Sequence, residues 1–441
     1  MNRLTKTVLF LFSLFLISLV INAQPTQKLS LTQVCQLAIE NSKQLKLSRT
    51  ETEAAQKATQ VTETLRTPSI DASLSATYIG NGTMSDRLFR NWQSVEMPHF
   101  GNTFSLEASQ VIFAGGAISG NIDKARLQEQ VARLQYQQKE LDICFLITGY
   151  YLDLSKLQNQ QEVLLQNISR TELLIKQIRS KEKEGMALSN DVSRHELMMQ
   201  NLKLALIEVD NNRNIINNQL SLTLGLPSGT QIVPGSSALA NDLNLINRET
   251  LMPTAQNNLP ELKTAVLNKL IAAKEVAIAR SDYYPHFSLM AGNEFGGPIL
   301  IEVPTINKNF NYWYFGVGLK YNLASLYKNN RKVALANQSQ RVAASAEAVV
   351  VEQTAIALHN AYTNYTEAAE KVSVYETSLR LARENYGIIH NRYLNGLVLI
   401  TEMLDASNTQ LDAELAVVNA RLKLSYCYYK LLRETGAKFY R

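Results

Sequence analysis

The sequence predicts a mainly α-helical fold with a smaller portion of amphipathic β-strands, in which one unit of helix, β-hairpin, long helix and helix occurs twice. Three observations lead to this prediction. Residues 117–184 form one uninterrupted run of helix-forming residues. Residues 69–78 and 103–111 alternate between apolar and polar side chains. Landmarks of the first half of the chain recur in the second half at constant spacing.

The long helical run is expected to pack along its whole length. Residues 117–184 contain no proline and are rich in Gln, Leu, Lys, Glu and Ala. At 1.5 Å per residue such a helix would be about 100 Å long. Leu127, Leu134 and Leu141 are seven residues apart. A seven-residue repeat predicts packing against neighbouring helices, as in a coiled coil.

The alternating stretches predict β-strands with one apolar and one polar face. Ile70, Ala72 and Leu74 alternate with Asp71 and serines. This period of two is that of a strand, because successive side chains point to opposite faces. We expect the strands at 69–78 and 103–111 to form a hairpin with a long loop.

The internal repeat rests on matched positions in two ungapped tracts. Asn41, Leu45 and Pro68 are matched 217 residues later by Asn258, Leu262 and Pro285, and Gly185, Asp191 and Gly225 are matched 211 residues later by Gly396, Glu402 and Gly436. The change in spacing falls in the hairpin loop, which is shorter in the second copy. Two such tracts predict a duplication.

The expected domain organisation follows from this repeat. A signal peptide at 1–23 precedes the first repeat at 24–226, and a linker at 227–247 separates it from the second repeat at 248–441. The first repeat contains a helix from about 30 to 65, a hairpin at about 69–111, a long helix at about 117–184 and a helix at about 190–224. The second repeat contains a helix, a hairpin at about 286–321, a long helix at about 330–392 and a helix at about 401–435.

The N-terminus resembles a secretory signal. Arg3 and Lys6 precede a short apolar run at 8–21, and Ala23 follows it at a plausible cleavage site. A membrane anchor is the alternative, although the run is short for spanning a bilayer.

The net charge and the cysteine spacing argue against nucleic-acid binding and against a cysteine metal site. The formal charge of +5 is small for 441 residues and the basic residues are scattered, so we expect no nucleic-acid partner. Cys35, Cys144 and Cys427 have no metal-ligand spacing. We interpret them as buried free thiols, with one disulfide as the alternative.

No catalytic motif is recognisable. His195 and Glu196 lack a second histidine at Met199, so this helix is not that of a zinc hydrolase. There is no phosphate-binding glycine loop and no nucleophile elbow. We therefore expect no enzymatic activity, no metal and no cofactor.

Four amphipathic strands require other copies of the chain. Bacterial membrane barrels begin at eight strands. An open sheet would leave unpaired backbone groups in lipid, at several kcal/mol each. Three copies would supply twelve strands and a cylinder of helices, and two or four copies would also close.

Several stretches resemble the TolC-like outer-membrane efflux protein family over essentially the whole mature chain. They are LSLTQVCQLAIENSKQL near the start, QVIFAGG at 110–116, residues 185–192, and NRYLNGLVLITEMLDA at 391–406. The resemblance implies a homotrimer whose twelve-stranded barrel lies in the outer membrane and whose α-helical tunnel extends into the periplasm. It implies passive conduction for a tripartite efflux or a type I secretion system, with a periplasmic adaptor and an inner-membrane pump as partners.

The resemblance also implies roles for residues near the two helical turns. Asp191 and Tyr393 correspond to a network that keeps the channel closed in relatives. A representative of this family has an arginine in that network at the place of Val398, and valine cannot donate a charged hydrogen bond, so we expect the strength or the wiring of the network to differ here.

Other implied positions have structural alternatives. Glu402 and Asp405 correspond to an acidic ring at the periplasmic entrance, or they stabilise a helix N-terminus. The docking turns for the adaptor would comprise Gly185, Met186, Gly396, Leu397 and Val398, and simple helix termination is their alternative role.

A periplasmic coiled-coil adaptor or scaffold without a pore is the competing function. The four alternating strands favour the channel, because an adaptor needs no apolar outer face.

Overall fold

The computed structural model describes residues 26–227, 229–235, 247–302 and 305–439. The expected signal peptide and part of the expected linker lie outside these residues. The helices are α2 (Leu31–Asn41), α3 (Lys43–Glu63), η1 (Thr64–Arg66), α4 (Ala117–Lys183), α5 (Ser189–Leu224), α6 (Arg248–Asn258), α7 (Pro260–Ser281), α8 (Ser325–Leu394) and α9 (Ile400–Glu434). The strands are β1 (Thr26–Leu29), β2 (Ser69–Tyr78), β3 (Gly82–Met84), β4 (Gln93–Val95), β5 (Phe100–Ala114), β6 (Gln231–Pro234), β7 (His286–Gly297) and β8 (Phe310–Lys320).

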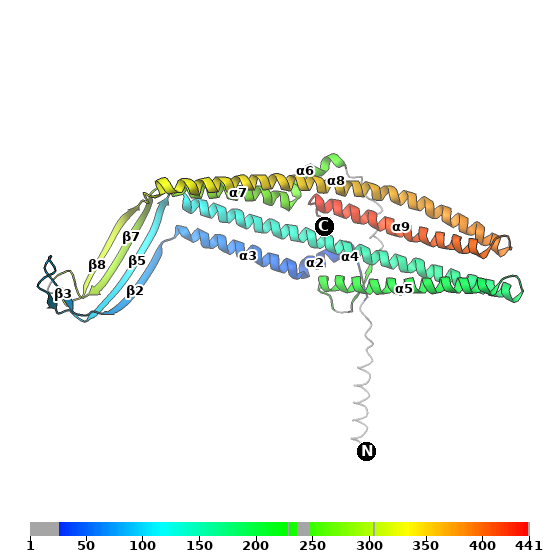
Figure 1. Ribbon diagram of the computed structural model, residues 1–441, viewed down its shortest axis with the longest axis horizontal. Coiled ribbons are helices and arrows are strands. Elements are labelled where there is room, and N and C mark those ends of the chain that lie inside the picture. The colour runs from blue at the N-terminus through cyan, green and yellow to red at the C-terminus, as the bar shows by residue number, and fades with distance from the viewer. Residues whose placement is uncertain (1–25, 228, 236–246, 303–304, 440–441) are drawn as a thin grey trace, which may run out of the picture. The chain divides into compact units, whose positions relative to one another are not determined.

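Both halves of the chain contribute to each of two compact units. Of the described residues, those within 26–49, 136–262 and 351–439 form one unit, and those within 50–135 and 263–350 form the other. In the first unit α5 runs back alongside α4, and α9 runs back alongside α8 (Figure 1). We call α4 with α5 the first helical hairpin and α8 with α9 the second helical hairpin.

The second unit contains a four-stranded antiparallel sheet in the order β2-β5-β7-β8 (Figure 1). The strands of the first repeat, β2 and β5, therefore pair with those of the second repeat through β5 and β7. A small additional hairpin, β3 with β4, lies in the loop between β2 and β5. Its strands are three residues long, too short for an alternating pattern to reveal them.

The first helix of each repeat is interrupted, although the sequence predicted one continuous helix up to about residue 65. Ser42 separates α2 from α3 with a ψ of 123°, and Leu259 separates α6 from α7 with a ψ of 118°. The hydroxyl of Ser42 accepts a hydrogen bond from the Leu45 amide and starts the new helix. Pro260 disfavours the helical conformation for the residue before it, which explains the second break. The breaks lie at equivalent positions of the two repeats.

Two glycines that end helices occupy equivalent, crowded positions. Gly225 and Gly436 have φ values of 68° and 72°. A Cβ at Gly225 would lie 3.1 Å from the Cβ of Asn41, and one at Gly436 would lie 2.7 Å from the backbone of Leu259. Each glycine thus allows the last helix of its repeat to end against the break in the first helix.

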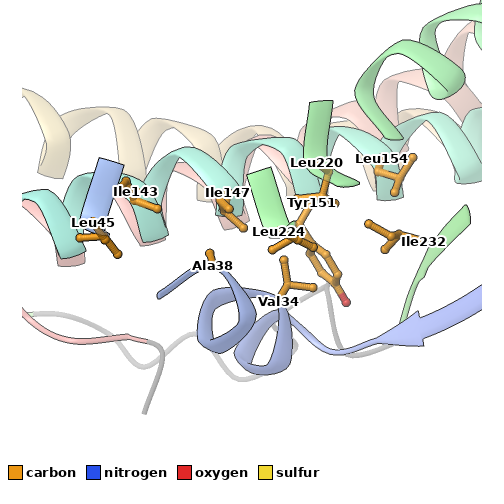
Figure 2. Close-up of a cluster of buried hydrophobic side chains, with 10 residues drawn as sticks. All are labelled: Val34, Ala38, Leu45, Ile143, Ile147, Tyr151, Leu154, Leu220, Leu224 and Ile232. Atoms are coloured by element: carbon orange, nitrogen blue, oxygen red, sulfur yellow. The ribbon is translucent and has the colours of Figure 1, made fainter. Parts of the chain in front are cut away.

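A hydrophobic cluster in the first unit joins elements from both ends of the first repeat (Figure 2). Its buried members are Val34, Ala38, Leu45, Ile143, Ile147, Tyr151, Leu154, Leu220, Leu224 and Ile232. The Tyr151 hydroxyl donates to the Leu29 carbonyl at 2.8 Å and accepts from the Gly235 amide at 3.0 Å. These two bonds hold the parallel pair of β1 and β6 against α4.

The three cysteines are free and buried. Cys35 and Cys144 share a small cluster with Leu141, and the Cys35 thiol lies 3.9 Å from the Cys144 carbonyl oxygen. The thiols therefore help to pack α2 on α4.

The crowding at Gly436 leads to a comparison with Gly396, which has φ +73 and open space around it. Gly396→Ala should lose about 1–2 kcal/mol, the cost of a left-handed conformation. Gly436→Ala should lose about 2 kcal/mol more, because its Cβ also meets the Leu259 backbone. Thermal unfolding of the purified variants measures both. Equal losses would show that the space at Gly436 is not limiting.

Candidate functional site

The two turns that close the helical hairpins have the same backbone structure. Gly185 and Gly396 adopt φ values of 74° and 73°. The Met186 amide donates to the Lys181 carbonyl at 2.8 Å, and the Leu397 amide donates to the Arg392 carbonyl at 2.9 Å. This arrangement satisfies the last carbonyls of a helix with a left-handed glycine.

Apolar side chains project into solvent at these turns. Met186 and Leu188 are 65% and 70% exposed, and their repeat equivalents Leu397 and Leu399 are 67% and 70% exposed. Met186 and Leu397 were expected at these turns from the sequence, whereas Leu188 and Leu399 were not. Their matching positions in the repeats were the signal that could have identified them. Large apolar groups exposed at equivalent positions are typical of an interaction surface.

Tyr393, near the end of α8, is buried in a tip cluster shared by both helical hairpins. The cluster contains Leu174, Ile175, Ile178, Val192, Tyr393, Ile400 and Met403, with Val398 packed against it. Val398 thus contributes an apolar contact to this cluster.

Lys181 supplies a cation at this point, and no motif in the sequence marks it. Its Nζ donates to the carbonyls of Tyr393 at 3.3 Å and Leu394 at 2.5 Å. It also lies 5.4 Å from the centroid of the Tyr393 ring. A cation is favourable both at the C-terminus of a helix and over an aromatic face. Lys181 of α4 therefore ties the first helical hairpin to the end of α8.

Asp191 lies in the first turn of α5, close to Tyr393. Its carboxylate accepts a hydrogen bond from the Leu188 amide at 3.1 Å and so caps its own helix. Burial raises the pKa of the Tyr393 hydroxyl, and the Asp191 charge raises that pKa further. The two side chains are neighbours, but among the described residues no hydrogen bond joins the Tyr393 hydroxyl to this carboxylate.

His195 is a fully buried polar residue one turn beyond Asp191. Its Nδ1 lies 3.1 Å from the Asp191 carbonyl oxygen, so the tautomer protonated at Nδ1 donates to it. Its Nε2 is buried without a hydrogen-bond partner in the described structure. Burial lowers the pKa of His195, which keeps the imidazole neutral.

The two acidic residues near the start of α9 differ in their relation to the helix N-terminus. Glu402 lies in the first turn of α9, where a carboxylate favours the helix. Asp405 lies beyond that turn, and both side chains are exposed. Neither forms an ion pair with another described residue. Both charges are therefore available to solutes near this end of the helix.

The four-stranded sheet has one apolar face. Its strand register places on that face Ile70, Ala72 and Leu74 of β2, Phe104, Leu106 and Ala108 of β5, Phe287, Leu289 and Ala291 of β7, and Trp313, Phe315, Val317 and Leu319 of β8. Leu74 and Trp313 are about four-fifths exposed, at 80% and 78%. An exposed apolar surface that crosses four strands is typical of membrane contact.

The opposite face of the sheet is polar. Ser69 bonds to Ser109 and Ser73 to Ser105 through their hydroxyls, at 2.8 and 2.7 Å. The Tyr312 hydroxyl donates to Glu294 on the same face. A sheet with one apolar and one polar face suits a boundary between lipid and water.

The described helices include none long and apolar enough to cross a membrane. In the same residues, no group of three or more His, Cys, Asp and Glu side chains could hold a metal ion.

The sequence profile for outer membrane efflux proteins matches residues 34–226 and 251–436 of the chain. The chain belongs to the outer membrane efflux protein family. The two matched segments cover both repeats, so family membership confirms the duplicated fold expected from the sequence. No curated protein matches the chain significantly in sequence.

Solved structures of outer-membrane proteins have the same fold as this efflux protein. The outer-membrane channel OprN is 16% identical, with a TM-score of 0.75, and the match covers 93% of this chain and 91% of OprN. VceC of Vibrio cholerae is 17% identical, with a TM-score of 0.76 and coverage of 93% and 96%. The channel protein CusC is 14% identical, with a TM-score of 0.78 and coverage of 92% of each chain.

Family membership decides between the two functions that the sequence left open. The protein is an exit duct of the outer membrane that extends into the periplasm, and it is not an adaptor without a pore. The family consists of channel proteins rather than enzymes.

The two faces of the sheet lead to a prediction about adjacent residues of β2. Leu74→Arg places a charge on the apolar face and should cost about 2–4 kcal/mol near the bilayer midplane. Ser73→Arg places the same charge on the polar face and should be tolerated. The yield of each variant in isolated outer membranes measures the difference. Equal yields would contradict the assignment of the faces.

The buried imidazole leads to a prediction about pH. The pKa of His195 is lowered from 6.5 in the folded state, so the unfolded state binds more protons when the pH falls below about 6.5. The stability contributed by the neutral imidazole is therefore present above that pH and lost below it. Hydrogen exchange of α5, corrected for intrinsic rates, should accelerate between pH 7.5 and 5.5 in the wild type and less in His195→Gln. The same pH response in both would contradict this role.

Proposed function

We propose that three copies of the chain join to form the duct, with twelve strands closed into one barrel. The observation that supports this proposal is the four-stranded sheet with one apolar face and two edge strands, β2 and β8. In lipid, the backbone groups of those edges must find partners in other copies. In this assembly the apolar face lies toward lipid and the polar face toward the lumen.

The duct conducts passively, and a pump in the inner membrane supplies the energy. Support for this part of the proposal comes from the family, which consists of channel proteins. A periplasmic adaptor connects duct and pump in this proposal, as the resemblance to TolC-like proteins suggests.

The adaptor docks on the turns of the helical hairpins. Gly185, Met186, Gly396, Leu397 and Val398 form this surface, together with the exposed Leu188 and Leu399. Its support is the pair of matching apolar groups, because apolar side chains at equivalent turns offer a partner two similar contacts.

The gate lies at the tip cluster and includes Asp191, Tyr393 and Lys181. Support comes from the burial of Tyr393 and from the contacts of Lys181 with the end of α8. Movement of the second helical hairpin away from the first would break these contacts. The acidic pair Glu402 and Asp405 forms the entrance ring, where six carboxylates in a trimer favour cations.

Reconstitution tests the duct and its gate together. In native mass spectrometry, the purified protein should have the mass of a trimer. In planar bilayers, it should conduct ions. Asp191→Ala combined with Tyr393→Ala should raise the conductance severalfold, because the closed tip loses its packing and its helix cap. Tyr375→Ala, on the same helix but outside the tip cluster, is the control and should conduct like the wild type.

Two results would contradict this proposal. A stable monomer without conductance would remove the duct. A trimer whose double variant conducts like the wild type would leave the duct and remove the gate assignment.

Neutralising one carboxylate tests the entrance ring. Asp405→Asn should lower the ratio of cation to anion permeability by about half, since three of six charges are removed. The matched control is Asp412→Asn, which removes an exposed charge farther along α9. Reversal potentials under a salt gradient measure both. An unchanged ratio for Asp405→Asn would assign this residue to helix stabilisation alone.

A further inference from the structure

A layer of buried polar side chains interrupts the apolar contact between α4 and α9. Its members are Asn167 and Thr171 of α4 and Gln410 and Glu414 of α9, each at most 7% exposed. Apolar residues flank this polar layer along both helices. Leu164 and Leu174 are buried on α4, and Met403 and Val417 are buried on α9.

Glu414 lies at the centre of the polar layer. Its carboxylate accepts hydrogen bonds from Asn167 Nδ2 and from Gln410 Nε2, both at 3.0 Å. Arg170 and Arg383 approach it at 3.4 and 3.5 Å. Burial alone would raise the pKa of Glu414, but the hydrogen bonds from Asn167 and Gln410 and the Arg170 charge outweigh burial and lower it. The residue is therefore a buried carboxylate ion.

The partners of this carboxylate come from both helical hairpins. Asn167 and Arg170 belong to the first helical hairpin, whereas Gln410 and Arg383 belong to the second. The two arginines are about half exposed, so water weakens their ion pairs. The hydrogen bond between Asn167 and Glu414 is buried, so water weakens it less than it weakens these two ion pairs.

The polar layer has different effects on the closed state of the two hairpins and on their separation. In the closed state, a buried ion satisfied by four donors fixes one register of two packed helices, as single polar residues do in coiled coils. When the hairpins separate, water can replace the donors, whereas apolar residues at the same places would gain nothing from water. A cavity of about 10 Å³, lined in part by Asn167, Arg170 and Tyr386, adjoins the polar layer. That is roughly the space of one water molecule.

We propose that Glu414 is a positioning residue of the gate, which sets the closed register of the second helical hairpin on the first and releases Asn167 and Arg170 when the duct opens. This inference rests on the proposed function, in which opening separates the two hairpins.

Planar-bilayer recordings of the purified full-length protein test this role. Glu414→Ala should raise the fraction of time spent open about tenfold, since the loss of a buried charged acceptor leaves Asn167 and Gln410 unpaired. Glu414→Gln should have an intermediate effect, because the amide oxygen still accepts from Asn167 but carries no charge for the arginines. Glu376→Gln is the matched control. It removes an ion pair with Arg421 that joins α8 and α9 within one hairpin, and it should not change the open fraction.

Replacing the polar layer by apolar residues should change the open fraction in the opposite direction to Glu414→Ala. Asn167→Leu combined with Glu414→Leu removes the buried ion and restores apolar packing, so the open fraction should return to the wild-type value or fall below it. A merely structural role would lower the melting temperature in Glu414→Ala and leave the open fraction of all these variants unchanged. That result would overturn the proposal, as would a raised open fraction in the double leucine variant.

The gate variant of the tip cluster separates the two proposals. If Asp191→Ala with Tyr393→Ala opens the duct while the Glu414 variants behave like the wild type, the role of Glu414 is wrong and the duct stands. If the wild-type protein and every variant fail to conduct, the proposed function and the role of Glu414 both fail.

Discussion

The structure depends more on the pairing of backbone N–H and C=O groups than on any single side-chain contact. The sheet satisfies β5 and β7 internally, but β2 and β8 each leave one edge open. One face of the same sheet is apolar and exposed, and when that face lies against lipid, water cannot serve as the partner of those edges. The helices carry no comparable demand, since they satisfy their backbone internally and need neighbours only for their apolar seams. A single subunit therefore lacks hydrogen-bond partners at the edges of its sheet, whereas its helices lack only apolar contacts.

Features with a short period could be predicted from the sequence. The continuity of α4 follows from the absence of proline in its residues, and the faces of β2 follow from the alternation around Ile70 and Leu74. The turns at Gly185 and Gly396 follow from glycine at the end of a helical pattern. The duplication could be recognised because each copy keeps these local signals at the same spacing. Each of these properties depends on residues that are neighbours in the chain.

Features that depend on partners far apart in the chain could not be predicted. Lys181 meets the end of α8 across 212 residues, and Glu414 meets Asn167 across 247. In the sequence both are ordinary charged residues on a helix, and periodicity does not say which helix lies opposite. The break at Ser42 was missed for a related reason, because serine is tolerated within helices and only its hydrogen bond to Leu45 marks a new start. The positions of Asp191 and Tyr393 came from resemblance, and the structure adds that they are neighbours.

The crowded glycines have a consequence for how the two copies can diverge. A Cβ at Gly225 would meet Asn41, and one at Gly436 would meet Leu259, so each crowded position is confined to its own copy of the repeat. A substitution at one joint needs a compensating change only within the same copy, because the other joint shares no atoms with it. The halves are thus free to drift apart in sequence while the architecture persists.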